Sequence, residues 1–282
     1  MVRWNDVREG WLAAEGVVRD SAPPPATSVK QMRRLSLFRT TAPLTVTGYR
    51  GAGKSTLYDA LEGRVSLGYR PPGKSLGAET HRTVFKTGRK KIRAESWVLP
   101  GQPGEERNEA LGRVMGDGNY PVGVVHAVSW GYNSVRADEL PHLEDRLIAD
   151  GRPRTIASVR DLNLKEELQD FKDISRRLVR AWSRRDKVWL IIVVTKSDLF
   201  WDDRRKAMEY YLPGEGAGSA FSRHLDDFAD TLGDALERVL ILPFSCFPEP
   251  YKIFHDEAPS QFVNREQDAL FNNFLSVMGK VL

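Results

Sequence analysis

The sequence predicts an α/β fold in which a largely parallel sheet is covered by helices on both faces. Short apolar runs, such as VWLIIVV at 188–194, alternate along the chain with stretches of helical periodicity. This alternation is typical of parallel strands joined by helices. Residues 81–99 instead show a hairpin pattern with a turn at 87–89, which adds one antiparallel strand. A glycine-rich turn at 48–53 joins an apolar run directly to a helical pattern.

The N-terminal part of the chain is expected to be a helix followed by a linker. Within residues 3–19, apolar side chains recur at helical spacing, which predicts an amphipathic helix. Three consecutive prolines in SAPPPATS at 21–28 indicate a stiff, extended linker, and a basic stretch follows at 30–39. The apolar stripe of the helix comprises Trp4, Val7, Trp11 and Val18.

The later elements are distinguished by period and by residue type. Apolar runs rich in valine and isoleucine predict strands, whereas apolar residues three and four positions apart predict helices. A polar segment at 134–165 lacks strand periodicity. The expected strands are at 43–48, 122–130, 187–194 and 238–245, and the expected helices start at Ser55 and cover 164–182, 203–212, 224–238 and 267–282.

Composition predicts a soluble protein of the cytoplasm. The chain has 282 residues, of which 41% are hydrophobic and 28% charged, as in ordinary globular proteins. One cysteine, Cys246, excludes an internal disulfide framework and fits a reducing compartment. The N-terminus is too polar for a signal peptide, and the longest apolar run is too short for a transmembrane segment. A net charge of +4 is weak evidence for nucleic acid, and we expect none to bind.

The stretch GYRGAGKS at 48–55 matches G-x-x-x-x-G-K-[ST], with the preceding strand and following helix that this motif requires. Glycines let the backbone wrap closely around phosphates, and the helix N-terminus adds partial positive charge. Lys54 would reach the β- and γ-phosphates, and the Ser55 hydroxyl would ligate Mg²⁺. The candidate nucleotide-binding residues here are Gly48, Arg50, Gly51, Ala52, Gly53, Lys54, Ser55 and Thr56.

The four residues TKSD at 195–198 follow the apolar strand at 188–194 and favour guanine as the base. Asp198 would accept two hydrogen bonds from guanine, a donor pair that adenine does not offer. Lys196 would lay its stem along the base plane, and Thr195 would brace the loop. The alternative is a helix start that Asp198 caps.

Together these motifs resemble the Ras-like class of P-loop GTPases. The resemblance implies a six-stranded sheet, a GTPase domain over 41–282 with an insertion near 134–165, and bound GTP or GDP with Mg²⁺. Residues 1–40 lie outside it. In the family, a Ser-Ala turn meets the guanine oxygen, and Ser245 and Cys246 in LPFSCF fill that place.

The resemblance also implies two switch segments that sense the γ-phosphate. The first lies at 66–83, where Thr80 or Thr83 would ligate Mg²⁺; we favour Thr80 because it precedes the hairpin. In the second, WVLPGQPG at 97–104, Gly101 would donate to the γ-phosphate and Gln102 would position water. Val98 stands where the family has an aspartate. Lys54 and Gln102 are therefore the expected catalytic residues, and turnover should be slow or depend on a partner.

Several alternatives stay open. Arg50 either steadies charge at the γ-phosphate or points away into solvent. The chain is a GTPase switch, a P-loop ATPase or small-molecule kinase, or a nucleotide-binding interaction module that does not hydrolyse. The apolar stripe of the N-terminal helix packs against the core of its own chain or against a protein partner, such as an effector, an activator or a second copy. Packing on a membrane surface is the least favoured alternative.

Overall fold

The structure is a computed structural model and describes residues 2–20, 41–62, 64–65, 79–87, 90–98, 104–115, 121–183, 187–214 and 218–281. The expected linker at 21–28, the basic stretch at 30–39 and most of the first switch lie outside these residues. Gly101 and Gln102 lie outside them too.

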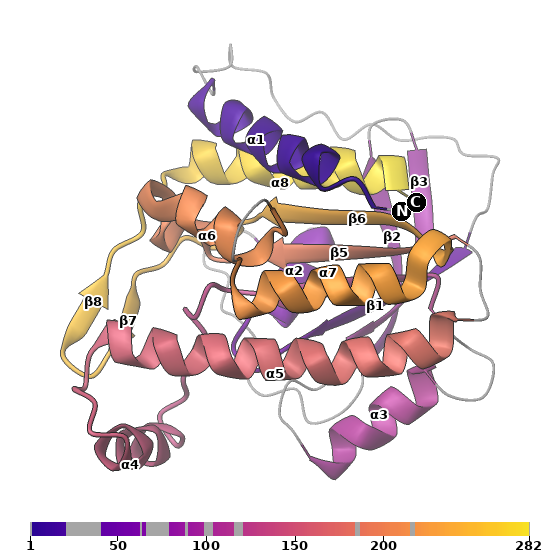
Figure 1. Cartoon of the computed structure of the whole chain (residues 1–282). Helices are drawn as coiled ribbons and strands as arrows, with labels where there is room; N and C mark the ends of the chain where they lie inside the picture. The colour runs from indigo at the N-terminus through magenta and orange to yellow at the C-terminus, as the bar shows by residue number, and fades with distance from the viewer. Residues whose placement is uncertain are drawn as a thin grey trace.

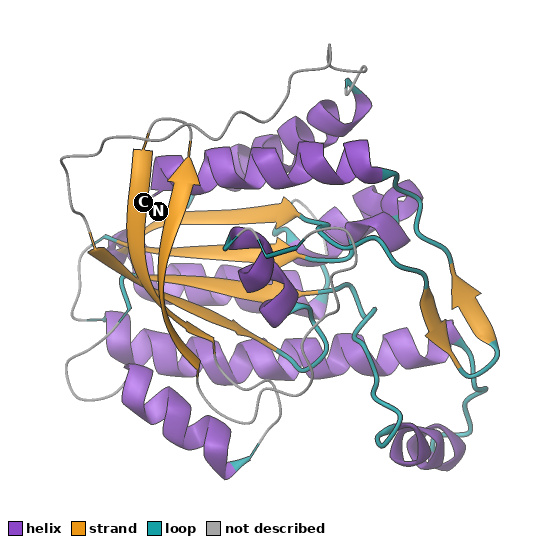
Figure 2. Cartoon of the chain, turned by 180° about the vertical axis from the view of Figure 1, so that it is seen from behind, coloured by secondary structure: helices purple, strands orange, loops and turns teal. Residues whose placement is uncertain are grey.

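The six-stranded sheet is mixed, as the sequence predicts. Its strand order is β2-β3-β1-β4-β5-β6, and β2 pairs antiparallel with β3 while every other neighbouring pair is parallel. The predicted α/β class and the hairpin are therefore confirmed (Figure 2). The strands are β1 (Thr41–Gly48), β2 (Glu79–Thr87), β3 (Lys90–Val98), β4 (Gly123–Val128), β5 (Val188–Val194) and β6 (Leu236–Pro243).

Helices pack on both faces of the sheet, and the side chains of β5 show why its sequence is apolar throughout. Leu190, Ile192 and Val194 join the core on one face, and the alternate residues of β5 join the core on the other. Every residue of β5 is buried, so a continuous apolar run is required. The first face carries α3 (Glu105–Met115), α5 (Ile156–Trp182), α6 (Arg204–Tyr211) and α7 (Ala220–Leu232), and the second carries α2 (Lys54–Leu61) and α8 (Asn264–Val281).

Two helices have boundaries that differ clearly from the sequence-based expectation. The helix expected at 164–182 begins at Ile156, inside the polar segment, because the Thr155 hydroxyl caps it by accepting from the Ser158 N–H. The expected helix at 224–238 ends at Leu232, where Gly233 adopts a φ of 52° and allows the chain to turn into β6.

The 134–165 segment contains one further helix, and a short second sheet follows β6. Both lie near the N-terminal end of α5 (Figure 1). The sequence missed these elements because each is too short to show a clear period. They are α4 (Leu140–Ala149) and the antiparallel pair β7 (Tyr251–Ile253) and β8 (Asp256–Ala258); short 3₁₀ turns cover Ser197–Leu199, Trp201–Asp203 and Gly233–Ala235.

The N-terminal helix α1 (Trp4–Arg19) packs on β6 and α8 (Figure 1). Val7 and Trp11 join the main core, while Ala14 and Val18 contact Phe262 and Leu270. The stripe is thus covered by the chain itself, although the sequence left three occupants open and placed this helix outside the domain. Since β6 is the last strand of the sheet, α1 also shields its edge.

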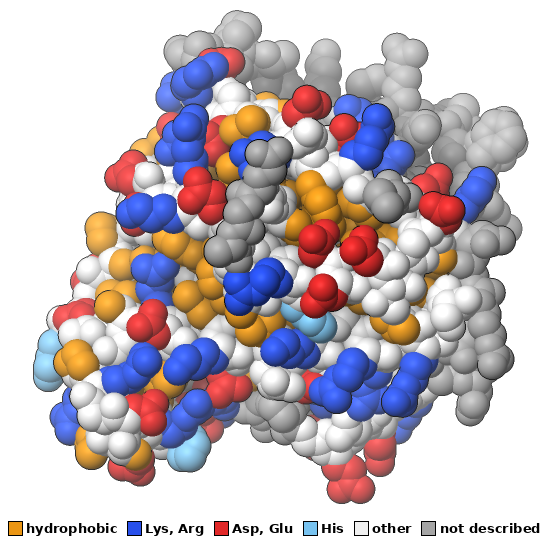
Figure 3. Space-filling model, viewed as in Figure 1, with side chains coloured by type: hydrophobic (Ala, Val, Ile, Leu, Met, Phe, Trp, Pro, Cys, Tyr) orange, Lys and Arg blue, Asp and Glu red, His pale blue; other side chains and the backbone are white. Residues whose placement is uncertain are grey.

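The surface in the view of Figure 3 carries basic and acidic side chains interspersed, with smaller apolar areas between them. Ion pairs at the surface include Arg146–Glu166 and Arg152–Asp161, each with an acidic residue of α5. None of the helices in the described ranges has both the length and the apolar character needed to cross a bilayer.

Replacing Trp11 with alanine should destabilise the whole fold. Its side chain is fully buried, and its indole N–H donates to Glu15 at 3.0 Å. A buried tryptophan truncated to alanine typically costs about 3–5 kcal/mol. Urea unfolding of Trp11→Ala measures this, with Leu12→Ala, at a side chain 41% exposed, as the matched control. The control should change the free energy of unfolding by less than about 0.5 kcal/mol. Equal small effects would show that α1 is a detachable appendage.

Candidate functional site

The predicted phosphate loop, residues 48–55 and here called the glycine loop, lies between β1 and α2, as its motif requires. Gly48 has a φ of 137° and Gly51 a φ of 70°, both in the region that favours glycine. A Cβ at Gly48 would lie 2.2 Å from the Ala127 carbonyl oxygen, and one at Gly51 would lie 2.3 Å from the Ser134 carbonyl oxygen. Both glycines are needed because other backbone passes directly beside them.

Lys54 bends back over the glycine loop. Its Nζ donates to the carbonyl oxygens of Gly48 at 2.8 Å and Tyr49 at 3.0 Å. Burial of the ammonium lowers the pKa of Lys54 to about 8, a shift that nearby Asp170 opposes and Arg107 reinforces. A buried cation with only carbonyl acceptors is electrostatically suited to an anionic ligand.

A buried polar cluster lies between the sheet and helices α3 and α5. Arg107 of α3 forms an ion pair with Asp170 of α5, and both side chains are almost fully buried. His126 shares a hydrogen bond of 2.9 Å with the Thr47 hydroxyl through Nδ1. Burial, aided by the Arg107 and Lys54 charges, lowers the pKa of His126 to about 3, so this histidine is neutral. The cluster ties α3 to α5 beneath Lys54.

The TKSD residues contact the glycine loop, although many residues separate the two motifs. The Thr195 hydroxyl donates to Ala52 O at 2.8 Å. Lys196 adopts a φ of 54°, and its Nζ donates to Gly51 O at 3.0 Å and to Tyr132 O at 2.6 Å. The residue is only half-buried, but its ammonium is enclosed by protein, and this desolvation lowers the pKa of Lys196 to about 8.

Asp198 and Ser245 are brought together by the ends of β5 and β6. The Ser245 hydroxyl donates to Asp198 Oδ1 at 2.7 Å, and both residues are buried. Burial raises the pKa of Asp198, and the hydroxyls of Ser245 and Ser260 lower it in part. Oδ2 is buried too and makes no hydrogen bond of good geometry with the described chain. Among the described residues, the Ser260 hydroxyl is close enough to act on this carboxylate, but no donor meets Oδ2 with good hydrogen-bond geometry.

Cys246 is a small buried side chain beside α2. Its thiol lies 3.7 Å from Thr56 O, and burial raises its pKa above the usual range for a thiol. The residue therefore packs between the Ser245 turn and the helix that follows the glycine loop, while Ser55 and Thr56 occupy the first turn of that helix.

A second loop, residues 129–134, contacts the glycine loop and was missed by the sequence analysis. The Ser134 N–H donates to Gly51 O at 3.0 Å, and the Asn133 side-chain amide donates to Arg50 O at 3.0 Å. Trp130 and Gly131 both have positive φ, at 48° and 80°, so the chain turns sharply after β4. The sequence does contain a signal for this loop, because polar residues that follow a parallel strand lie at the same sheet edge as the glycine loop.

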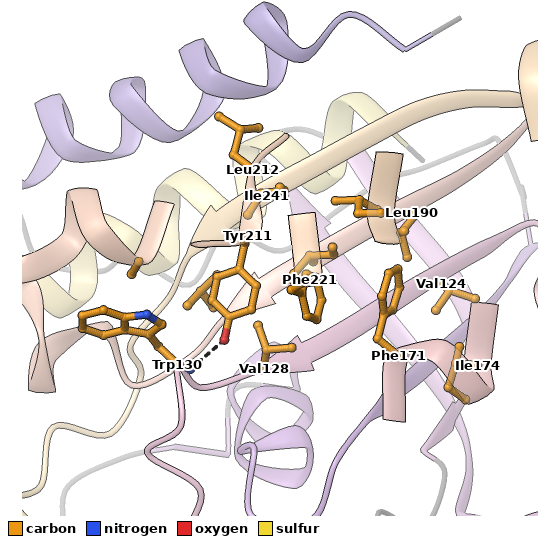
Figure 4. Packing of buried hydrophobic residues seen from close by; sticks show 14 of the residues in the cluster. Val124, Val128, Trp130, Phe171, Ile174, Leu190, Tyr211, Leu212, Phe221 and Ile241 are labelled. Carbon is orange, nitrogen blue, oxygen red and sulfur yellow. Dashed lines mark hydrogen bonds between the residues drawn. The ribbon is translucent and has the colours of Figure 1, made fainter. Parts of the chain in front are cut away.

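Glu167 of α5 fixes the start of the 129–134 loop. It is fully buried and accepts from the Ser129 N–H at 2.8 Å and from the Tyr211 hydroxyl at 2.7 Å. The Tyr211 oxygen in turn accepts from the Trp130 N–H at 2.9 Å, the dashed contact in Figure 4. Burial raises the pKa of Glu167, and the hydrogen bonds from Tyr211 and Ser129 lower it in part. This network positions backbone that the glycine loop then contacts.

Arg50 has a partner that neither sequence-based alternative foresaw. Its guanidinium forms an ion pair with Glu139 at 2.9 Å and donates through Nε to the Tyr49 hydroxyl at 3.1 Å. The side chain is 32% exposed and is turned toward Glu139, so it is ion-paired at the surface of the molecule.

The predicted switch residues are described only in part. Thr80 lies inside β2, paired with Trp97, so the expectation that it precedes the hairpin is wrong; Thr83 lies further along the same strand. Val98 is the last residue of β3 and pairs with Val46 of β1, which places it at the sheet edge where the glycine loop begins. No cluster of three or more potential metal-binding His, Cys, Asp or Glu residues occurs in the described ranges.

A scan against protein-family models finds no match, and a search of curated proteins finds none either. The evidence for what the site binds is therefore the arrangement of its residues. Glycine-loop carbonyls, two lysines and one buried carboxylate converge at the ends of β1, β4, β5 and β6.

Replacing Lys54 with methionine should change how stability depends on pH in the nucleotide-free protein. The folded-state pKa of Lys54 is about 8, against 10.5 for an unperturbed lysine, so the unfolded chain binds more protons between these values. Wild-type stability should therefore rise relative to Lys54→Met as pH increases from about 8 to 10, by up to about 1.4 kcal/mol per pH unit.

Urea unfolding between pH 7 and pH 10 measures this difference. Lys252→Met, which removes an exposed lysine paired with Glu257, is the control and should run parallel to wild type. Parallel profiles for Lys54→Met as well would contradict the lowered pKa.

Proposed function

We propose that this chain is a P-loop GTP-binding protein that hydrolyses GTP slowly and acts as a nucleotide-dependent switch. The observation that carries the proposal is the convergence of two sequence motifs. Lys196 of TKSD donates to Gly51 of the glycine loop, and Asp198 of the same motif is held by Ser245. Separate motifs for phosphate and for guanine thus lie side by side, in the chain order that the resemblance implies.

Phosphate binding is supported by the glycine loop and Lys54. The loop precedes the N-terminus of α2, where backbone N–H groups and the helix dipole favour an anion. Bound phosphate would replace the Gly48 and Tyr49 carbonyls as acceptor for Lys54 Nζ. The donor set fits Mg²⁺ chemically, because the ion prefers hydroxyl and phosphate oxygens; Ser55 would hold it, with Thr80 as the second expected ligand. The ion would neutralise phosphate charge.

Guanine selectivity is supported by the Asp198 carboxylate. Oδ1 accepts from Ser245, whereas Oδ2 is buried and has no well-aligned donor among the described residues. Guanine N1–H and its exocyclic amine would supply donors there. Adenine lacks that pair, so bound ATP would leave a buried acceptor unsatisfied.

Slow hydrolysis is the expected consequence of Val98. A carboxylate at this place acts on Mg²⁺ through water, and losing such indirect ligands typically weakens a site by 10–100-fold. Glu105 and Glu106, two possible substitutes, are exposed in the first turn of α3. Gln102 stays the expected water-positioning residue. The second candidate function, a nucleotide-binding interaction module that does not hydrolyse, is favoured by the same valine.

Wild-type protein should bind GTP and GDP with Mg²⁺ and reject ATP, as measured by calorimetry. Asp198→Asn should weaken guanine binding and favour xanthine nucleotides, whose O2 accepts from the new amide. Asp202→Asn, a charge-matched change at an exposed residue in the next turn, should leave both affinities unchanged. ATP binding as tight as GTP binding would exclude a guanine site and favour a P-loop ATPase or small-molecule kinase.

Intrinsic GTP hydrolysis should be no faster than that of unaided Ras-like proteins, about 3–5 × 10⁻⁴ s⁻¹. Val98→Asp should tighten Mg²⁺ binding in the nucleotide complex. Single-turnover release of phosphate measures the rate. A rate near 1 s⁻¹ would contradict a slow switch, and no release even with a protein activator would favour the non-hydrolysing module.

A further inference from the structure

Arg50 extends from the glycine loop into a small open pocket beside α4 and α5. The pocket is formed where the loop, the 129–134 loop and these two helices meet. Arg50 Nη1 lies 2.9 Å from Glu139 Oε1, and the Glu139 side chain is only 14% exposed. Charged and polar side chains contribute much of the lining, among them Tyr49, Arg50, Asn133, Glu139, Arg146 and Glu166.

Both residues of this ion pair make further hydrogen bonds that fix their positions. The second carboxylate oxygen of Glu139 accepts from the Arg136 N–H at 3.3 Å, at the turn that leads into α4. The Arg50 carbonyl accepts from the Asn133 amide at 3.0 Å, and its Nε donates to Tyr49. The ion pair therefore joins two fixed pieces of backbone, the glycine loop and the start of the 134–165 segment.

The position of Arg50 in the glycine loop bears on how the loop would bind a nucleotide. Arg50 lies between Gly48 and Gly51, the residues whose tight turns shape the loop around an anion. Its guanidinium has two possible anionic acceptors, the Glu139 carboxylate and the outermost phosphate of a bound nucleotide. Its Nη1 is engaged by Glu139 and its Nε by the Tyr49 hydroxyl, so the guanidinium must give up the contact with Glu139 to turn toward the phosphate.

We propose that Glu139 is a positioning residue that holds the Arg50 guanidinium toward α4 and so restrains it from the terminal phosphate of GTP. This inference rests on the proposed function. GDP lacks the terminal phosphate, so the restraint lowers affinity for GTP more than affinity for GDP. Glu139, the residue of the 134–165 segment that directly precedes α4, thereby sets how strongly the glycine loop distinguishes GTP from GDP.

The test compares affinities for GTPγS and GDP by calorimetry, with Mg²⁺, in wild type, Glu139→Gln, Arg50→Ala and the double variant. Glutamine keeps the shape and removes the charge, so Glu139→Gln should raise the ratio of GTPγS to GDP affinity by about 5- to 20-fold. Arg50→Ala alone should leave the ratio close to wild type, and the double variant should lose the gain. Glu144→Gln, which removes the same charge from α4 at the Arg154 ion pair, should change nothing.

Three results would overturn the inference while leaving the proposed function intact: an unchanged ratio in Glu139→Gln, a gain that survives in the double variant, or a gain equal to that of Glu144→Gln. If Glu139→Gln fails to fold, Arg50→Ala still decides, because a fall in the ratio of tenfold or more would show that Arg50 already binds the terminal phosphate. Failure of wild type to bind either nucleotide overturns the proposed function and this inference together.

Discussion

The close approach of the glycine loop to the neighbouring strand ends is the constraint on which the site depends. Gly48 lies against the Ala127 carbonyl and Gly51 against the Ser134 backbone, with no room for a Cβ at either position. The carbonyls of the loop are consequently within reach of Thr195, Lys196 and Asn133. Parallel strands whose carboxyl ends meet at one edge make such convergence possible. The contacts of Thr195, Lys196 and Asn133 with the glycine loop all lie at this edge of the sheet.

The lysines give this edge its electrostatic character. Lys54 and Lys196 both donate to backbone carbonyls, which are neutral acceptors, and desolvation lowers the pKa of each to about 8. A phosphate or another anion supplies the charge that these carbonyls cannot. Asp170 offsets Lys54 only partly, because its carboxylate is already paired with Arg107. The site is thus arranged to gain more from an anion than an exposed lysine would.

The strands of the sheet are predicted well because the pattern that indicates each strand lies within neighbouring residues of the sequence. The β5 run is apolar throughout, and the glycine motif carries its own strand and helix context. The α5 start was missed because Thr155 lies in a polar run, although its spacing to Ser158 is a capping signal. The Arg50–Glu139 and Glu167–Tyr211 contacts were beyond sequence reasoning, since each joins side chains that only the tertiary fold brings together. Thr80 was expected to precede the hairpin because the hairpin pattern was taken to begin at residue 81, whereas β2 begins at Glu79.

Helix α1 precedes every strand of the sheet along the chain, yet it packs on β6 and α8, which follow the other strands of that sheet. Trp11 and Val7 consequently lack this partner surface until β6 and α8 have been synthesised. Closing so long a loop is slow, and exposed apolar residues favour aggregation while it is open. Docking of α1 is therefore expected to be a late folding step, and its apolar residues stay accessible to chaperones until β6 and α8 are in place.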